Sequence, residues 1–199
     1  RKEPAFLGGV TLRKAAEARR MQGDLAGADS LFTKYADASS SQPGFALVRA
    51  HWEFTSGRKK KAMDLLRELA AKPGAAPQLV SAALAQLSVW LLDAGDRAGA
   101  HQRAQQAMKT AAGAAMPLAA ICLFVTDTET SASEWTLRSE KTFAHPSAAA
   151  IKQLALAYAL LFNRHFREAS LVLKASYEQT NPNNEEHLRE LLAWSYAEQ

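Results

Sequence analysis

Small residues recur along the chain about every 35 positions, each inside a stretch with helical apolar periodicity. The intervals between successive members are 34, 38, 34, 35 and 36 residues. Such a period is typical of stacked helix–turn–helix units, because one helix pair cannot bury its apolar stripe alone and needs a neighbour to complete a core. The recurring positions are Ala16, Ala50, Ser88, Cys122, Ala157 and Ala193.

Glycine turns separate the paired helices that this period predicts. Glycine adopts the left-handed conformation that ends a helix, and aspartate caps the start of the next one. An alanine lies five residues after each of these glycines, and alanine makes up 41 of the 199 residues, which favours helix throughout. Alternating runs of β-branched residues are missing, so we predict an all-α chain. The turns are Gly23-Asp24, Ser56-Gly57 and Gly95-Asp96.

The same signals set the bounds of the expected helices. Ser131-x-x-Glu134 has the form of a capping box and Asn183-x-x-Glu186 has the related Asn-capped form, so each marks the start of a helix. The register of the helix near Glu134 stays open, because its face becomes apolar only after a shift of one residue onto Trp135. The expected helices are 10–22, 25–39, 44–56, 59–72, 76–94, 97–112, 115–127, 131–144, 147–163, 166–180 and 184–198.

The second helices of the pairs carry an alanine and, four residues later, another apolar residue. The matches are Ala28-x3-Phe32, Ala62-x3-Leu66, Ala100-x3-Ala104 and Ala169-x3-Leu173, with prolines near several unit ends at Pro43, Pro73, Pro146 and Pro182. This frame resembles the tetratricopeptide repeat (TPR) family in a degenerate, bacterial-type form, over about residues 10–199. The resemblance implies a right-handed α-α superhelix of about five and a half helix–turn–helix repeats in one domain, 1–199. The implied repeats lie near 9–43, 44–75, 76–114, 115–146 and 147–182, with a half-repeat at 183–199.

The resemblance also implies that the first helix of each pair lines a concave binding face. In relatives that bind free C-terminal carboxylates, Lys and Asn side chains clamp the carboxylate from this face. Of the corresponding positions here only Arg13 is suitable, so the resemblance does not extend to that clamp. An apolar groove suits an amphipathic helix or a hydrophobic segment instead, although an apolar stripe at helical spacing is more often core. The expected partner-binding residues are Arg13, Arg20, His51, Phe54, Leu92, Leu123, Tyr158 and Trp194.

No motif for phosphate binding, dinucleotide binding or hydrolytic catalysis occurs in the sequence. Ser56-x-x-Lys59 matches the S-x-x-K motif of some serine enzymes, but it lies in a turn between helices and lacks the accompanying motifs. The five histidines have no metal-type spacing, and Cys122 occupies a small core position where a buried thiol is expected. We therefore predict that the chain is not an enzyme and binds no metal or cofactor.

Positive charge concentrates in the N-terminal third of the chain. Residues 1–72 carry a net charge of +6 and residues 73–199 a net charge of −2, which together give +4. The basic run Arg58-Lys59-Lys60-Lys61 is expected to form a solvated outer face. The charge also motivates a nucleic-acid-binding helical repeat. Such repeats read bases with polar side chains where this sequence has alanine and leucine, so a nucleic-acid partner is the weaker hypothesis.

The sequence favours a protein–protein interaction scaffold that binds a peptide or helix of a partner. The chain begins at Arg1 and its last helix, 184–198, has no second helix, so it reads as a module of a larger protein. The alternative is a regulatory or structural segment of a multidomain bacterial signalling enzyme. Apolar Leu192 and Trp194 on the half-repeat predict continuation of the array or self-association. A single cysteine and no apolar stretch long enough to span a membrane favour a cytoplasmic location.

Overall fold

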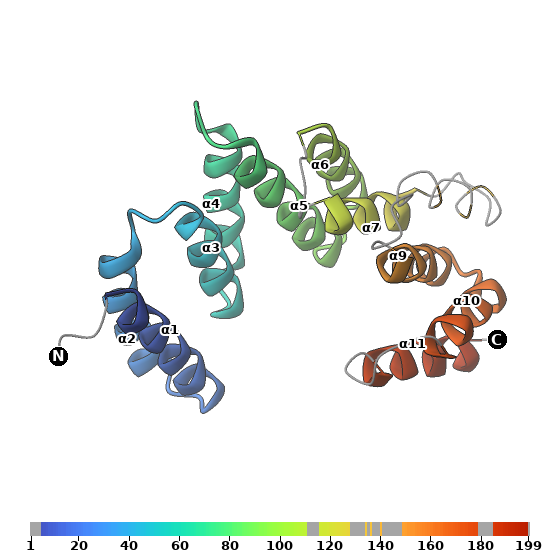
Figure 1. The fold of residues 1–199 in the computed structure, drawn as a ribbon, viewed down its shortest axis with the longest axis horizontal. Helices are drawn as coiled ribbons and strands as arrows, with labels where there is room; N and C mark the ends of the chain where they lie inside the picture. The colour runs from blue at the N-terminus through green and yellow to red at the C-terminus, as the bar shows by residue number, and fades with distance from the viewer. Residues whose placement is uncertain are drawn as a thin grey trace. The chain divides into compact units, whose positions relative to one another are not determined.

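The part of the chain described by the computed structural model is helical and contains no strand (Figure 1). The described backbone covers residues 5–110, 116–127, 149–178 and 185–198, with the single positions 134, 136 and 140. This confirms the all-α prediction for these residues. The helices are α1 Ala5–Met21, α2 Leu25–Ser39, α3 Phe45–Thr55, α4 Lys59–Ala71, α5 Pro77–Asp93, α6 Arg97–Thr110, α7 Met116–Thr126, α9 Ala149–Phe162, α10 Phe166–Glu178 and α11 Glu185–Ala197.

The predicted helix bounds agree with the structure to within two residues, except at the start of α1. That helix begins at Ala5 and continues through Gly8 and Gly9, where the sequence predicted a start at residue 10. Each glycine costs a helix about 1 kcal/mol, so the local preference was against a helical start before residue 10. The helix expected over 131–144, with its capping box at Ser131, falls largely outside the described residues.

The chain divides into two compact units, Arg1–Ala75 and Ala76–Gln199. In the N-terminal unit, α1 packs on α2 and α3 packs on α4. In the C-terminal unit, α5 packs on α6 and α7, α7 packs on α6 and α9, and α10 packs on α9 and α11. The two helices joined by each short turn therefore pack on each other, and in the C-terminal unit the successive first helices α5, α7 and α9 also pack on one another.

Four helix pairs are joined by turns of the same geometry. The N–H of Gly23 bonds the carbonyl of Arg20 at 3.0 Å, and the N–H of Asp24 bonds the carbonyl of Arg19 at 3.0 Å. This paired pattern is the Schellman motif, which places one residue in the left-handed conformation. The same two bonds recur at the other three turns. The left-handed residues are Gly23, Gly57, Gly95 and Arg164, with φ of 83°, 82°, 84° and 66°.

Arg164 is the one non-glycine residue at this position, and its replacement by glycine is expected to stabilise the chain. The left-handed conformation costs an L-residue about 1–2 kcal/mol, and glycine avoids this cost. Glycine also gives the unfolded chain more conformational freedom, which offsets part of the gain in stability. We expect Arg164→Gly to raise the free energy of unfolding by about 0.5–1 kcal/mol. Urea unfolding followed by circular dichroism measures the change. Gly57→Ala is the converse control and should lower stability; a gain in that variant would contradict the argument.

Two of the four turns are bridged by ion pairs of opposite polarity. Arg19 Nη1 lies 2.8 Å from Asp24 Oδ2 at the first turn. At the equivalent positions of the second turn, Glu53 pairs with Arg58. The basic and acidic partners have therefore exchanged places between the two helix pairs.

The recurring small residues mark the core, as the sequence predicted. Five of the six are buried, and so is every alanine and its apolar partner in the A-x3-F positions. The prediction is wrong for Ala193, which is exposed, while Leu191 and Ser195 of the same helix are buried. Leu191 joins the core formed with α9 and α10, and no described helix covers the Ala193 side of α11. The buried small positions are Ala16, Ala50, Ser88, Cys122 and Ala157.

Candidate binding pocket between α1 and α3

A pocket of about 520 Å³ opens in the N-terminal unit between α1 and α3, the first helices of two consecutive pairs. One wall comes from α1, whose lining residues are spaced three and four apart and so share a helix face. The other wall comes from α3 with the same spacing, and aromatic residues of α2 and α3 complete the lining. The lining residues are Arg13, Glu17, Arg20, Met21, Phe32, Leu47, Val48, His51, Trp52 and Thr55.

The aromatic part of the lining is Phe32 stacked on Trp52. Their ring centroids are 4.4 Å apart and the planes differ by 2°. Both side chains are buried, at 6% and 4% exposure, and they share a core with Ala16, Ala28 and Tyr35. Trp52 Nε1 also donates to Asp29 Oδ1 at 2.9 Å, which fixes the indole. We call the stacked pair Phe32–Trp52 the aromatic floor.

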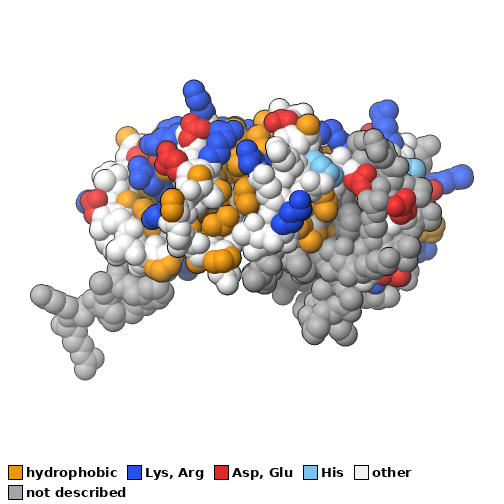
Figure 2. All heavy atoms as spheres, turned by 90° about the horizontal axis from the view of Figure 1, so that it is seen from above, with side chains coloured by type: hydrophobic (Ala, Val, Ile, Leu, Met, Phe, Trp, Pro, Cys, Tyr) orange, Lys and Arg blue, Asp and Glu red, His pale blue; other side chains and the backbone are white. Residues whose placement is uncertain are grey.

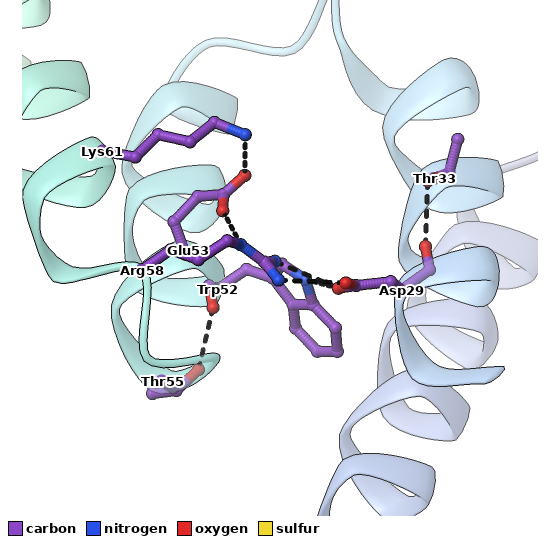
Figure 3. Close-up of polar contacts among 7 residues, drawn as sticks. All are labelled: Asp29, Thr33, Trp52, Glu53, Thr55, Arg58 and Lys61. Atoms are coloured by element: carbon purple, nitrogen blue, oxygen red, sulfur yellow. Dashed lines mark hydrogen bonds and ion pairs between the residues drawn. The ribbon is translucent and has the colours of Figure 1, made fainter. Parts of the chain in front are cut away.

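A network of ion pairs and hydrogen bonds fixes the Trp52 side of this floor through Asp29 (Figure 3). Arg58 donates to both carboxylate oxygens of Asp29, at 3.0 and 3.1 Å, and also to Glu53. Lys61 Nζ lies 2.8 Å from Glu53 Oε1. The Glu53 side chain is only 7% exposed, so its charge needs these two partners. The network links α2 to α3 and α4 and keeps Trp52 in place.

The pKa values of the two carboxyls follow from these contacts. Burial raises the pKa of Glu53, but the hydrogen bonds from Lys61 and Arg58 outweigh it and hold the pKa below its usual value. The hydrogen bonds from Arg58 hold the pKa of Asp29 low against a smaller effect of burial. Both groups are therefore carboxylates at neutral pH. Of the basic run, Lys59, Lys60 and Lys61 are exposed, as expected for a solvated face, and Arg58 is half-buried, while Arg58 and Lys61 also pair with Glu53.

The α1 wall carries two guanidiniums with unused hydrogen-bonding capacity. Arg20 Nη1 donates to the carbonyl of Thr55 at 3.1 Å, and Arg13 Nε lies 3.6 Å from Glu17 Oε1. The Nε atoms of Arg13 and Arg20 are buried without a hydrogen-bond partner. Among the described residues only Arg97 Nε, in the other unit, shares this condition. Each guanidinium has five N–H donors, so donors remain at this wall beyond the contacts with Thr55 and Glu17.

The pocket brings together Arg13, Arg20 and His51 from the predicted binding set. Phe54 lies on α3 but outside the lining, with Lys59 Nζ 5.1 Å from its ring centroid. On the face drawn in Figure 2, cationic and apolar side chains likewise lie side by side rather than in separate regions.

The remaining predicted residues lie in the C-terminal unit. Leu92, Leu123 and Tyr158 are half-buried, on α5, α7 and α9, and stay predictions. The ring of Tyr158 is 6.2 Å from that of Phe162, and burial raises the pKa of its hydroxyl. The side chain of Trp194 lies outside the described residues.

The repeat frame counts three further residues of the C-terminal unit among the inner-face positions, and all three belong to the core. Ala85, Ala119 and Leu161 are buried and offer no surface to a ligand. For these residues the interpretation of the apolar stripe as core is therefore correct.

Some lining residues carried no sequence signal for binding. Met21 and Thr55 lie next to the helix ends, where the repeat pattern places no inward-facing position. Trp52 comes two residues after a small core position and joins the lining through its stack with Phe32. Met21 is 83% exposed next to Arg20, and this exposure is a property of the structure that the sequence pattern does not give.

The described residues hold no group of three or more His, Cys, Asp or Glu side chains that could bind a metal ion. Cys122 is buried as expected, and burial raises the pKa of its thiol. Ser56 lies in the turn after α3, as the sequence indicated for the S-x-x-K match. None of the helices in the described ranges is both long and apolar enough to cross a membrane.

Comparison with known proteins leaves the family open. No protein-family model matches the chain, and the searches of curated proteins and of solved structures found no significant match. The likeness to tetratricopeptide repeats therefore rests on the residues and turns described above.

Proposed function

We propose that this chain is a tetratricopeptide-type interaction scaffold that holds a peptide or helix of a partner protein in the pocket between α1 and α3. One observation carries the proposal: the pocket is lined by the first helices of two consecutive pairs, which are the helices expected to line the concave binding face of such repeats. The repeated turn and the buried small positions support helix–turn–helix repeats as part of the same proposal.

The lining favours binding over chemistry. A pocket that holds a partner needs apolar walls and a few polar groups that set orientation, and this pocket has both. The hydroxyl of Thr55 donates to the backbone carbonyls of His51 and Trp52, at 3.0 and 3.2 Å, so it is engaged within its own helix. Among the described lining residues no nucleophile is paired with a base.

The test is capture of partners by the purified chain and by a pocket variant. Leu47→Glu, His51→Glu places two carboxylates on the α3 wall without touching the aromatic floor. Leu171→Glu is the matched control, because Leu171 is 70% exposed and lies on α10. Proteins from the source cell that bind the wild type are identified and then purified for direct titration.

We expect the control to bind as the wild type does and the pocket variant to lose at least tenfold in affinity, about 1.4 kcal/mol or more. Circular dichroism checks that the variant is folded. Equal binding by a folded pocket variant would show that partners attach elsewhere or not at all.

A further inference from the structure

The wall of the pocket formed by α1 has an ordered charge pattern. Arg13, Glu17 and Arg20 follow one another at four- and three-residue spacing, so they share a face in the order positive, negative, positive. The rise of 1.5 Å per residue places the two arginines about 10.5 Å apart along the helix axis. The two guanidiniums therefore present hydrogen-bond donors at two separate places on this wall, where Arg13 lies beside Glu17 and Arg20 Nη1 donates to the carbonyl of Thr55.

The facing wall formed by α3 is mainly apolar. Leu47 and Val48 lie one turn before His51, and the aromatic floor lies between the two walls. A ligand that fills this pocket must therefore present acceptors on one side and apolar side chains on the other. Its charged groups must also leave room for Glu17, which would repel a continuous run of negative charge.

We infer that the pocket binds an amphipathic helix of a partner protein that carries two acidic side chains seven residues apart. The inference rests on the proposed function and specifies its ligand. The two carboxylates pair with Arg13 and Arg20, which bind carboxylates through parallel N–H donors. The apolar stripe of the ligand helix packs on the half-buried Leu47 and Val48 of the α3 wall.

The spacing selects a helix over an extended peptide. Seven residues of a helix span about 10.5 Å and return to the same face after two turns. In a strand, about three residues span that distance at 3.3 Å each, and residues three apart point to opposite faces. Only the helix presents both carboxylates to α1 while its apolar side chains face α3.

The experiment selects ligands from a displayed library of random peptides of about 16 residues, long enough for about four helical turns. The peptides are fused at both ends, so that no peptide C-terminal carboxylate is free. The immobilised bait is the full chain. Enriched peptides are synthesised and titrated against wild type and variants by fluorescence anisotropy, with circular dichroism of the bound peptide.

Arg13→Glu, Arg20→Glu reverses the charge of the α1 wall. Lys14→Glu, Lys34→Glu is the matched control, since it makes the same change in net charge at exposed positions outside the lining. We expect enriched peptides with Asp or Glu at seven-residue spacing and apolar residues between them. The affinity of these peptides should fall at least about tenfold for the arginine variant and stay unchanged for the lysine control. Peptides with Lys at the two acidic positions should regain most of the lost affinity for that variant, which a misfolded protein would not allow.

Enriched peptides without the acidic pair, or peptides bound equally by the arginine variant, would overturn the inference. If the peptides without the acidic pair still bind the Leu47→Glu, His51→Glu variant more weakly than the wild type, the proposed function stands, and only the inference of an acidic helical ligand is refuted. Selection of no peptide sensitive to either pocket variant would overturn both. Displacement of the peptides by a homopolymeric RNA would assign the arginines to phosphate and would also overturn the acidic helix.

Discussion

Alanine in place of Trp52 is expected to lower the free energy of unfolding of the N-terminal unit by about 3–5 kcal/mol. The indole is buried, stacks on Phe32 at 4.4 Å and donates a hydrogen bond to Asp29. Its removal leaves a cavity between α2 and α3 and takes away half of the aromatic floor. Urea unfolding of the full chain measures the loss, and hydrogen exchange of α2 and α3 assigns it to this unit.

Trp52→Phe separates packing from hydrogen bonding. Phenylalanine keeps an aromatic ring against Phe32 but cannot donate to Asp29, which retains its contacts with Arg58. We expect this variant to lose only about 1 kcal/mol, the usual net contribution of one hydrogen bond. Equal losses in the two variants would mean that the hydrogen bond, and not the stack, holds α2 to α3.

Methionine in place of Arg58 is expected to destabilise the same unit by about 2–3 kcal/mol, because the buried Glu53 carboxylate loses one of its two cations. The pair with Asp29 contributes less, since both side chains are more than a third exposed and water screens the interaction. Urea titration at neutral pH measures the change. The double variant Arg58→Met, Glu53→Leu should recover most of the loss, because it leaves no buried charge; a double variant as unstable as the single one would contradict the argument.

The pH dependence of the free energy of unfolding gives an independent test of how Arg58 stabilises the two carboxylates. The folded pKa values of Glu53 and Asp29 lie below their usual values of 4.5 and 3.8. A lowered carboxyl pKa adds stability above the usual pKa, and this stability is lost as the pH falls through the folded value. The wild type should therefore lose stability on acidification below about pH 4.5. The Arg58→Met variant should lose less stability over that pH range. Without the guanidinium, the carboxylate forms of Glu53 and Asp29 are stabilised less in the folded state.

The helices and the register of the helix pairs could be predicted from the sequence because their signals are local. A glycine that ends one helix and an alanine five residues later act over a single turn, and the structure confirms them at Gly23, Gly57 and Gly95. The turn at Arg164 repeats the same geometry without glycine. There the buried Ala169 that follows identifies the turn, and packing of α9 on α10 holds Arg164 in place.

The pocket could be predicted only in part, because its aromatic floor depends on long-range contacts. Arg13, Arg20 and His51 follow from helix periodicity in the repeat frame. The contact of Asp29 with Trp52 joins residues 23 positions apart, and its contact with Arg58 joins residues 29 apart. No spacing rule predicts which polar side chains meet when two helices cross. The exposure of Ala193 was missed for a related reason, since burial depends on which helix covers that side of α11.

The opposite polarity of the ion pairs at the first two turns makes the two helix pairs non-interchangeable. A hybrid that joined α1 to α4 would set Arg19 against Arg58, and one that joined α3 to α2 would set Glu53 against Asp24. Like charges would then meet across a turn whose backbone is otherwise the same. The two ion pairs thus favour the native joining of α1 to α2 and of α3 to α4, so exchange of whole helix–turn–helix units is less costly here than exchange of single helices.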